Sequence, residues 1–150
     1  MGMFDFVKDA GERIFGRGKK EAENNAAKST ALAGQVKALG LKVENFTVVY
    51  DDGVATLAGT TPSQAEKEKI VLVVGNTQGV SRVDDQMVVE VPEPEAVLYT
   101  VKSGDSLSRI AKAHYGNAMK YPVIFEANKP MLTDPDKIYP GQVLRIPPLD

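Results

Sequence analysis

A short connector of alternating proline and glutamate divides this chain. Residues 92–95 read Pro-Glu-Pro-Glu, a stiff acidic sequence that neither a helix nor a central strand accepts. The 150 residues must therefore build two small hydrophobic cores, one on each side. The chain has no cysteine, which excludes a disulfide framework and a thiolate metal site. We predict an N-terminal segment over residues 1–20, a first domain over 21–91, a connector over 92–96 and a second domain over 97–150.

The N-terminal segment begins with a short amphipathic pattern. Phe4, Val7 and Gly11 recur at spacings of three and four residues, which is typical of one face of a helix. We expect this segment to pack on the first domain. A second helix is predicted over residues 24–41, ending near Gly40, because apolar residues recur on one face: Leu32, Val36 and Leu39.

The first domain continues with a hairpin signal. Two β-rich runs, 46–50 and 54–59, flank Asp51-Asp52-Gly53, a sequence that tolerates the positive φ of a tight turn. Ser63 and Glu66 then form a capping box, in which the hydroxyl and the carboxylate each satisfy a free amide at the start of a helix. That helix ends at Gly75-Asn76, and residues 80–91 are predicted as one further strand. The predicted order is α-β-β-α-β, with both helices on one face of the sheet.

The second domain has a different order of elements. A strand is predicted over residues 98–101, and Gly104-Asp105-Ser106 precedes a helix that Gly116 ends. A second helix covers residues 121–128, and an irregular loop leads to a last strand over 142–146. The predicted order is β-α-α-β, so the whole chain is an α+β protein with two small domains.

The charge and hydropathy of the chain restrict its expected partners and location. Twenty acidic and eighteen basic residues leave the chain near neutral, which argues against nucleic acid as its partner. A local basic cluster is interpreted as a solvated flank: Arg13, Arg17, Lys19 and Lys20. Charges at positions 5, 8 and 9 interrupt any apolar core of a secretion signal, and no stretch approaches the roughly 18 apolar residues of a membrane span. We expect a cytoplasmic monomer.

The residues that could carry chemistry do not form a catalytic set. Asp51-Asp52-Gly53 lacks the alternating ligands and closing glutamate of a calcium loop, which favours a hairpin turn. His114 is the single histidine and has no cysteine or acidic pair nearby in sequence to complete a metal site. The serines of the second domain have no base at the required spacing and are interpreted as helix caps: Ser103, Ser106 and Ser108. We therefore predict a binding protein and not an enzyme.

Four segments of the second domain follow one another in a recognisable order. They are Tyr-Thr-Val-Lys-Ser-Gly-Asp-Ser-Leu at 99–107, Tyr-Gly at 115–116, Ile-Phe-Glu-Ala-Asn at 124–128 and Ile-Tyr-Pro-Gly-Gln-Val-Leu-Arg-Ile-Pro at 138–147. Together they resemble a LysM domain, whose family fold is βααβ and whose usual ligand is a glycan containing N-acetylglucosamine, such as peptidoglycan. The resemblance implies a glycan groove between two loops, formed by Gly104, Asp105, Ser106, Leu107, Asn128 and Ile138.

The first domain resembles a BON domain. The hairpin turn, Val-Ala-Thr-Leu-Ala-Gly at 54–59 and the glycines at 75 and 79 carry this likeness. With the start Met-Gly-x-Phe-x-Phe-Val-Lys-Asp-Ala-Gly, the whole chain is similar to bacterial potassium-binding proteins built of a BON and a LysM domain. The resemblance implies selective binding of K⁺ by a cytoplasmic sensor, in which the ion orders the N-terminal segment and the first domain and docks the two domains.

A site for K⁺ should expose main-chain carbonyls at chain reversals, because this large cation prefers a ring of neutral oxygens. Residues 7–11 end the first predicted helical segment and residues 75–80 follow the helix capped by Ser63, so both include carbonyls without helical partners. For either segment alone an ordinary glycine C-cap is the favoured interpretation, and only the resemblance shifts the balance toward an ion site. The candidate ligands are the carbonyls of Val7, Ala10, Gly75, Thr77, Gly79 and Val80.

Two alternatives remain open. The chain could bind peptidoglycan fragments through its LysM groove and maintain the cell envelope, although the predicted cytoplasmic location opposes this. It could also assist a cell-wall hydrolase, although its length leaves no room for a catalytic domain.

Overall fold

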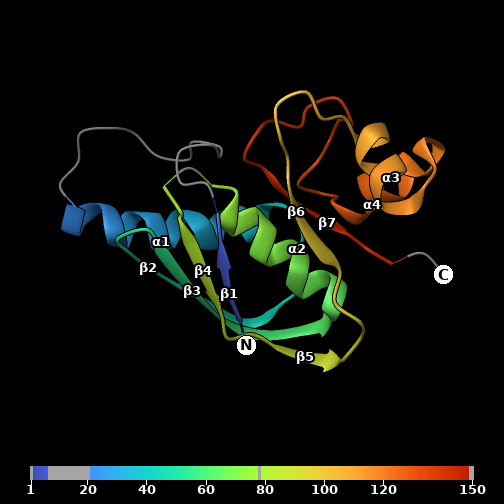
Figure 1. Cartoon of the computed structure of the whole chain (residues 1–150). Helices are drawn as coiled ribbons and strands as arrows, with labels where there is room; N and C mark the ends of the chain where they lie inside the picture. Colours follow the sequence, from blue (N-terminus) through green and yellow to red (C-terminus); the bar gives the residue numbers. More distant parts are fainter. Residues whose placement is uncertain (1, 7–20, 78, 149–150) are drawn as a thin grey trace.

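The computed structural model describes residues 2–6, 21–77 and 79–148. Two modules lie side by side, a larger one with a sheet and two helices and a smaller one with two strands and its own helices (Figure 1). The predicted α+β class with two small domains is confirmed. No helix in the described part of the chain combines the length and the apolar character needed to cross a bilayer.

The first module is a five-stranded sheet with two helices. Its elements are β1 (Gly2–Asp5), α1 (Glu21–Ala38), β2 (Glu44–Asp51), β3 (Val54–Ser63), α2 (Gln64–Gly75), β4 (Arg82–Asp85) and β5 (Val88–Val91). The strands lie in the order β1-β4-β3-β2, and β5 pairs with the second half of β3. Strands β3 and β4 run parallel because α2 connects them, whereas β2 and β3 form an antiparallel hairpin.

The hairpin turn has the predicted geometry. Asp52 and Gly53 take positive φ values of 49° and 90°, as a two-residue turn between twisted strands requires. A Cβ on Gly53 would be strained at this φ and would lie 2.7 Å from the Oγ of Ser81, which would have to move. The carbonyl of Gly53 also accepts the amides of Ser81 and Arg82, which joins the turn to β4.

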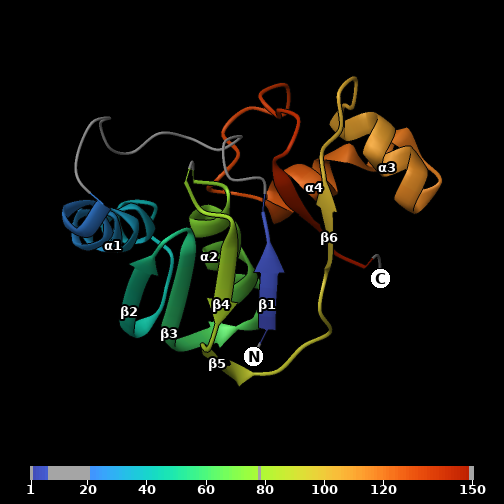
Figure 2. The same ribbon diagram turned by 60° about the vertical axis from the view of Figure 1, so that its left-hand side comes forward.

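The core of this module lies between the sheet and its helices. Along the hairpin, Val48, Tyr50, Ala55 and Leu57 are buried, whereas Val49 faces outward and is 61% exposed. This alternation buries one face of the sheet, and both helices lie on that side (Figure 2). The helices fill the core with Leu32 and Val36 from α1 and with Ile70, Val71, Val73 and Val74 from α2.

Helix α2 begins as predicted but without the full capping box. Ser63 is its N-cap, and its Oγ accepts the amide of Glu66 at 3.2 Å. The carboxylate of Glu66, however, accepts the amide of Lys42 at 2.9 Å instead of returning to the cap. Glu66 therefore fastens the loop after α1 to the start of α2.

Two predictions for the first module are wrong. Residues 2–5 are a strand and not part of a helix, because they pair with β4 in register from Gly2 with Asp85 to Asp5 with Arg82. The predicted single strand over 80–91 is two strands, β4 and β5. The Asp85 carboxylate accepts the amide of Met87 at 2.9 Å, and this turn lets the two strands pair with separate halves of β3. Residues 7–11, the rest of the predicted helical stripe, lie outside the described residues.

The second module has the predicted β-α-α-β order. Its elements are β6 (Val97–Thr100), α3 (Leu107–Tyr115), the 3₁₀ turn η1 (Ala118–Lys120), α4 (Tyr121–Ala127) and β7 (Val143–Ile146). Ser106 caps α3 by accepting the amide of Arg109, and Gly116 ends it with a φ of 75°. The helices cover one face of the β6–β7 pair around a core that includes Ile110, Ile124 and Leu144.

Candidate functional site

The loop after α2 satisfies the last carbonyls of that helix. The amide of Asn76 donates to the Leu72 carbonyl at 2.9 Å, and that of Thr77 donates to the Val74 carbonyl at 3.2 Å. The Thr77 hydroxyl donates to the Val73 carbonyl at 2.9 Å. These bonds engage the carbonyls of Leu72, Val73 and Val74, so a ligand would have to use carbonyls from Gly75 onward.

The N-terminal strand leads directly to this loop. The amide of Phe6 donates to the Ser81 carbonyl at 2.9 Å, and the Phe6 ring lies against Gly75. A Cβ on Gly75 would be only 2.0 Å from Cζ of Phe6, so the ring requires glycine at this position. Phe6, the last described residue before position 7, thus lies against Gly75, the first residue of the predicted segment 75–80.

A positive side chain lies beside Gly79. The Tyr50 hydroxyl donates to the Gly79 carbonyl at 2.7 Å. The Nζ of Lys28 lies 3.3 Å from that hydroxyl oxygen and 4.7 Å from the centroid of the Tyr50 ring. The hydroxyl oxygen and the ring face both attract a cation, so this side of the loop accommodates positive charge.

Among the predicted ligands, the structure brings four residues into one turn: Gly75, Thr77, Gly79 and Val80. The Thr77 carbonyl accepts the amide of Val80 at 3.1 Å, which closes the turn. Val7 and Ala10 lie outside the described residues. The coordination of an ion by these carbonyls stays a prediction.

Asn76, in the middle of this loop, binds the second module. Its Nδ2 donates to the Val143 carbonyl at 2.8 Å, and its Oδ1 accepts the Val143 amide at 2.7 Å. Two residues further along β7, Asn128 accepts the amide of Arg145 at 2.8 Å and donates to its carbonyl at 3.0 Å. One edge of β7 is therefore satisfied by two asparagine side chains, one from each module.

A buried ion pair forms a second contact between the modules. The Nε and Nη2 of Arg145, on β7, lie 2.9 and 2.8 Å from Oε1 of Glu68, on α2. The other oxygen of Glu68 accepts the side-chain amide of Gln64 and the backbone amide of Ala96. Both charged side chains are 10% exposed, and their hydrogen bonds compensate for the loss of water.

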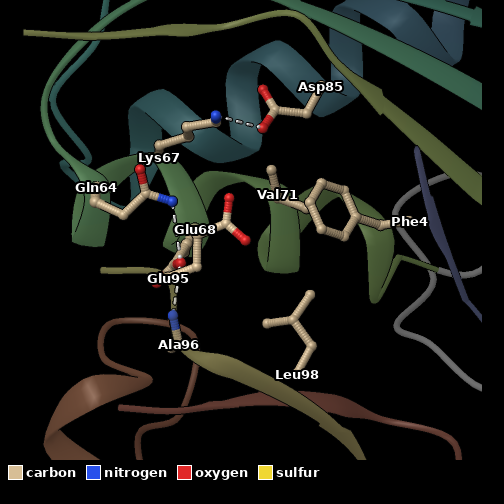
Figure 3. A pocket seen from close by; sticks show the side chains of 9 residues that line it. All are labelled: Phe4, Gln64, Lys67, Glu68, Val71, Asp85, Glu95, Ala96 and Leu98. Carbon is tan, nitrogen blue, oxygen red and sulfur yellow. Dashed lines mark hydrogen bonds and ion pairs between the residues drawn. The ribbon is translucent and has the colours of Figure 1, made fainter. Parts of the chain in front are cut away.

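A cavity of about 200 Å³ lies next to this ion pair, between α2, β1 and the start of β6 (Figure 3). Phe4, Val71 and Leu98 form its apolar wall. Lys67 and Asp85, which form an ion pair at 3.2 Å, also line it. The cavity thus lies where the N-terminal strand, α2 and the connector meet.

Family comparisons divide the chain at the same connector. The BON domain family matches residues 24–91, and the LysM domain family matches residues 99–147. The potassium binding protein Kbp of Escherichia coli O6:H1 is 48% identical over an alignment that covers 98% of this chain and 99% of that protein. This chain belongs to the Kbp family.

Other relatives share part of this organisation. An uncharacterized protein of Deinococcus radiodurans is 33% identical over 88% of this chain, which spans 56% of that protein. Esterase Rv1288 of Mycobacterium tuberculosis is 35% identical over 67% of this chain, which spans only 21% of the esterase. The full-length Kbp relative is named as a binding protein, and BON and LysM are not catalytic domain types.

The LysM half of this Kbp-family chain has a groove near the predicted position. A pocket of about 170 Å³ lies between the start of α3 and the loop after α4, and Ser106, Leu107 and Pro135 line it. Asn128 is 1% exposed and bonded to β7, so its side chain supports the groove loop from inside. Glycan binding by the groove stays a prediction.

The Asp105 side chain, at the N-terminal approach to α3, stabilises its own loop. Its carboxylate accepts the Tyr99 hydroxyl at 2.6 Å and the Lys102 amide at 2.8 Å. The hydrogen bond from Tyr99, and next the one from Lys102, lower the pKa of Asp105. The same bond to Asp105 raises the pKa of Tyr99, with further contributions from burial and from the negative charge.

Sequence reasoning missed the residues that join the two modules: Glu68, Asn76 and Arg145. One signal was present. Residues 143–146 read Val-Leu-Arg-Ile without the alternation of a half-exposed strand, which indicates that both faces are covered. All four side chains of β7 are buried. Helix α2 of the first module packs against this strand and covers the side that the second module leaves open.

Proposed function

We propose that this chain binds K⁺ through main-chain carbonyls of its BON module and acts as a cytoplasmic potassium sensor. The observation that carries the proposal is the 48% identity, over nearly the whole chain, with a protein named potassium binding protein. The predicted ligands are the carbonyls of the loop after α2, completed by those of the N-terminal segment.

The chemistry of the loop supports this choice of ion. Residues 75–80 read Gly-Asn-Thr-Gln-Gly-Val and include no charged side chain. Small divalent cations favour carboxylates, whereas K⁺ is held by neutral carbonyl oxygens. A ring of loop carbonyls therefore suits a large monovalent ion.

The position of Asn76 supports a sensing role. Asn76 stands between two predicted ligand residues, Gly75 and Thr77, while its side chain holds Val143 of the LysM module. An ion that fixes this loop would also fix the Asn76 side chain in the geometry that β7 requires. Such an ion binds the docked form of the chain more tightly than the undocked form. This difference in affinity sets how far the ion shifts the population toward the docked form.

A comparison of KCl and NaCl at equal ionic strength tests the proposal. We expect K⁺ to raise the melting temperature and to reduce the radius of gyration in X-ray scattering more than Na⁺ does. An ion at 100 times its dissociation constant stabilises the folded form by about 2.7 kcal/mol. Equal responses to the two salts would overturn the proposal, and the scattering mass tests the expectation of a monomer.

The Asn76→Ala variant separates binding from docking. It removes both hydrogen bonds to Val143 but leaves every main-chain carbonyl of the loop in place. We expect K⁺ still to bind, as measured by calorimetry, with a smaller change in the radius of gyration. Gln86→Ala is the control, because the Gln86 side chain is exposed and donates a hydrogen bond to nearby Asp84 within the first module.

A second candidate function is the binding of N-acetylglucosamine oligomers by the LysM groove. The family match over residues 99–147 and the pocket beside Ser106 and Leu107 favour it. An NMR titration with such an oligomer should shift the amides of this groove. Shifts confined to other surfaces, or none, would remove this candidate.

A further inference from the structure

The ammonium group of Lys28 lies against one of the predicted ion ligands. A Cβ built on Gly79 would be only 3.4 Å from the Nζ of Lys28, so the charged group occupies the space directly beside the Gly79 backbone. Because the Tyr50 hydroxyl oxygen lies 3.3 Å from that Nζ and 2.7 Å from the Gly79 carbonyl oxygen, the ammonium and this carbonyl oxygen are at most 6.0 Å apart. A positive charge of the protein is therefore a close neighbour of a carbonyl that is predicted to bind a cation.

The packing of α1 on the sheet holds Lys28 in this position. The hydroxyl of Ser29, the next residue of α1, accepts the amide of Tyr50 at 2.9 Å, and Tyr50 is 4% exposed. The Nζ of Lys28, which is half-buried, lies over the Tyr50 ring at 4.7 Å from its centroid. A cation at this distance is attracted by the face of the ring. The fold thus keeps the charge of Lys28 beside the loop.

An ion on the Gly79 carbonyl would meet this charge at short range. The loop itself, residues 75–80, contributes no negative side chain that would offset the repulsion. At a separation of about 6 Å and an effective dielectric constant of about 20 to 80, the repulsion between two unit charges changes a dissociation constant by about 3- to 100-fold. The charge of Lys28 is therefore large enough in effect to set the affinity of the site.

We propose that Lys28 is a built-in positive charge that weakens K⁺ binding and so sets the ion concentration to which the chain responds. This inference rests on the proposed function, because it requires K⁺ at the Gly79 carbonyl. Removal of the charge should strengthen K⁺ binding. A purely structural role of Lys28 would have the opposite sign, because the loss of its contacts with Tyr50 would loosen the loop and weaken K⁺ binding.

Three lysine variants on α1 separate charge from structure. Lys28→Met removes the charge and keeps an unbranched side chain, whereas Lys28→Arg keeps the charge. Lys37→Met is the matched control, because Lys37 is an exposed lysine of the same helix. It lies about 14 Å further along the helix axis, beyond the Debye length of about 8 Å at 0.15 M ionic strength.

Calorimetric titrations with KCl, at a total ionic strength kept constant with choline chloride, measure the dissociation constant of each variant. We expect Lys28→Met to bind K⁺ about tenfold more tightly than the unmodified chain. Lys28→Arg and Lys37→Met should each stay within about twofold of it. The gain in Lys28→Met should shrink at 1 M ionic strength, where the Debye length falls to about 3 Å. Lys28→Gln, which is also neutral, should reproduce the gain and serves if Lys28→Met does not fold.

Unchanged or weaker K⁺ binding by the neutral variants would overturn this inference. An equal gain in Lys28→Arg or Lys37→Met would also overturn it, because the effect would then not come from the charge at position 28. In these cases the unmodified chain still binds K⁺, so the potassium proposal stands. If the unmodified chain does not bind K⁺, both proposals fail.

Discussion

Asparagine side chains satisfy one edge of β7 in the way that a neighbouring strand would. A side-chain amide places an N–H donor beside a carbonyl acceptor, much as a peptide group of a neighbouring strand does. Asn76 uses both on Val143, and Asn128 uses both on Arg145. Because Asn76 belongs to the other module, the edge of β7 is complete only when the modules are docked.

The hydrogen-bonded pair of Tyr99 and Asp105 contributes to folding stability in a way that depends on pH. The bond from Tyr99 lowers the pKa of Asp105, so its stabilisation is present above the ordinary carboxyl pKa of about 4 and is lost as the pH falls through the lowered value. The raised pKa of Tyr99 acts at the other end: its contribution is present below about pH 10 and is lost above that range.

Replacing Tyr99 with Phe should raise the pKa of Asp105 toward its ordinary value. Stability would then begin to fall at a higher pH on the acid side. An NMR titration of the Asp105 carboxyl carbon, together with melting curves between pH 3 and pH 7, measures both effects. Tyr121→Phe is the control, because Tyr121 is 37% exposed and the Asp105 carboxylate bonds to Tyr99 and Lys102 instead. An unchanged Asp105 titration in Tyr99→Phe would contradict the assigned cause.

Helix α2 is the element that connects the parts of the fold. Its apolar side faces the sheet of the first module, Glu68 and Asn76 reach β7, and Gly75 receives Phe6 from the N-terminal strand. Phe6 can thus lie beside the loop only because Gly75 has no side chain.

Two glycine-to-alanine changes should act in opposite directions. Gly75→Ala places a Cβ inside the Phe6 ring position, and such overpacking costs about 1–3 kcal/mol. Gly34→Ala, in the exposed middle of α1, meets no atom within 4 Å and should stabilise the chain by about 0.5–1 kcal/mol through helix propensity. Urea unfolding measures both. Faster amide exchange in β1 should accompany Gly75→Ala alone.

The two modules together bury charge that neither would bury alone. Glu68 and Arg145 are 77 residues apart and meet across the interface, where the connector amide of Ala96 adds a further hydrogen bond to Glu68. Such a pair specifies one docked orientation, because a shifted interface would leave two unpaired charges without water.

Breaking this pair should separate the modules. We expect Arg145→Met to destabilise the docked chain by about 3–5 kcal/mol, because it leaves the Glu68 carboxylate without its cation. The double variant Glu68→Leu with Arg145→Met should recover most of that loss. Arg82→Met is the matched control: its pair with Asp5 is exposed on both sides, and such pairs contribute at most about 1 kcal/mol. Urea unfolding and scattering read out stability and docking. Equal effects at Arg82 and Arg145 would rule out this role.

The local turns and caps were predictable because each depends on a few neighbouring residues. The Asp52-Gly53 turn, the Ser63 and Ser106 caps and the helix end at Gly116 follow from the φ values and hydrogen bonds that those residues allow. The α+β class followed from the order of these elements.

Contacts between distant segments were not predictable in this way. Residues 2–5 form a strand because β4 pairs with them. Asn76 binds the second module through Val143, which lies 67 residues further along the chain. No local pattern encodes such partners, since hydrogen-bond donors and acceptors are alike all along the backbone. Which edges meet was decided by the packing of α2 against both cores.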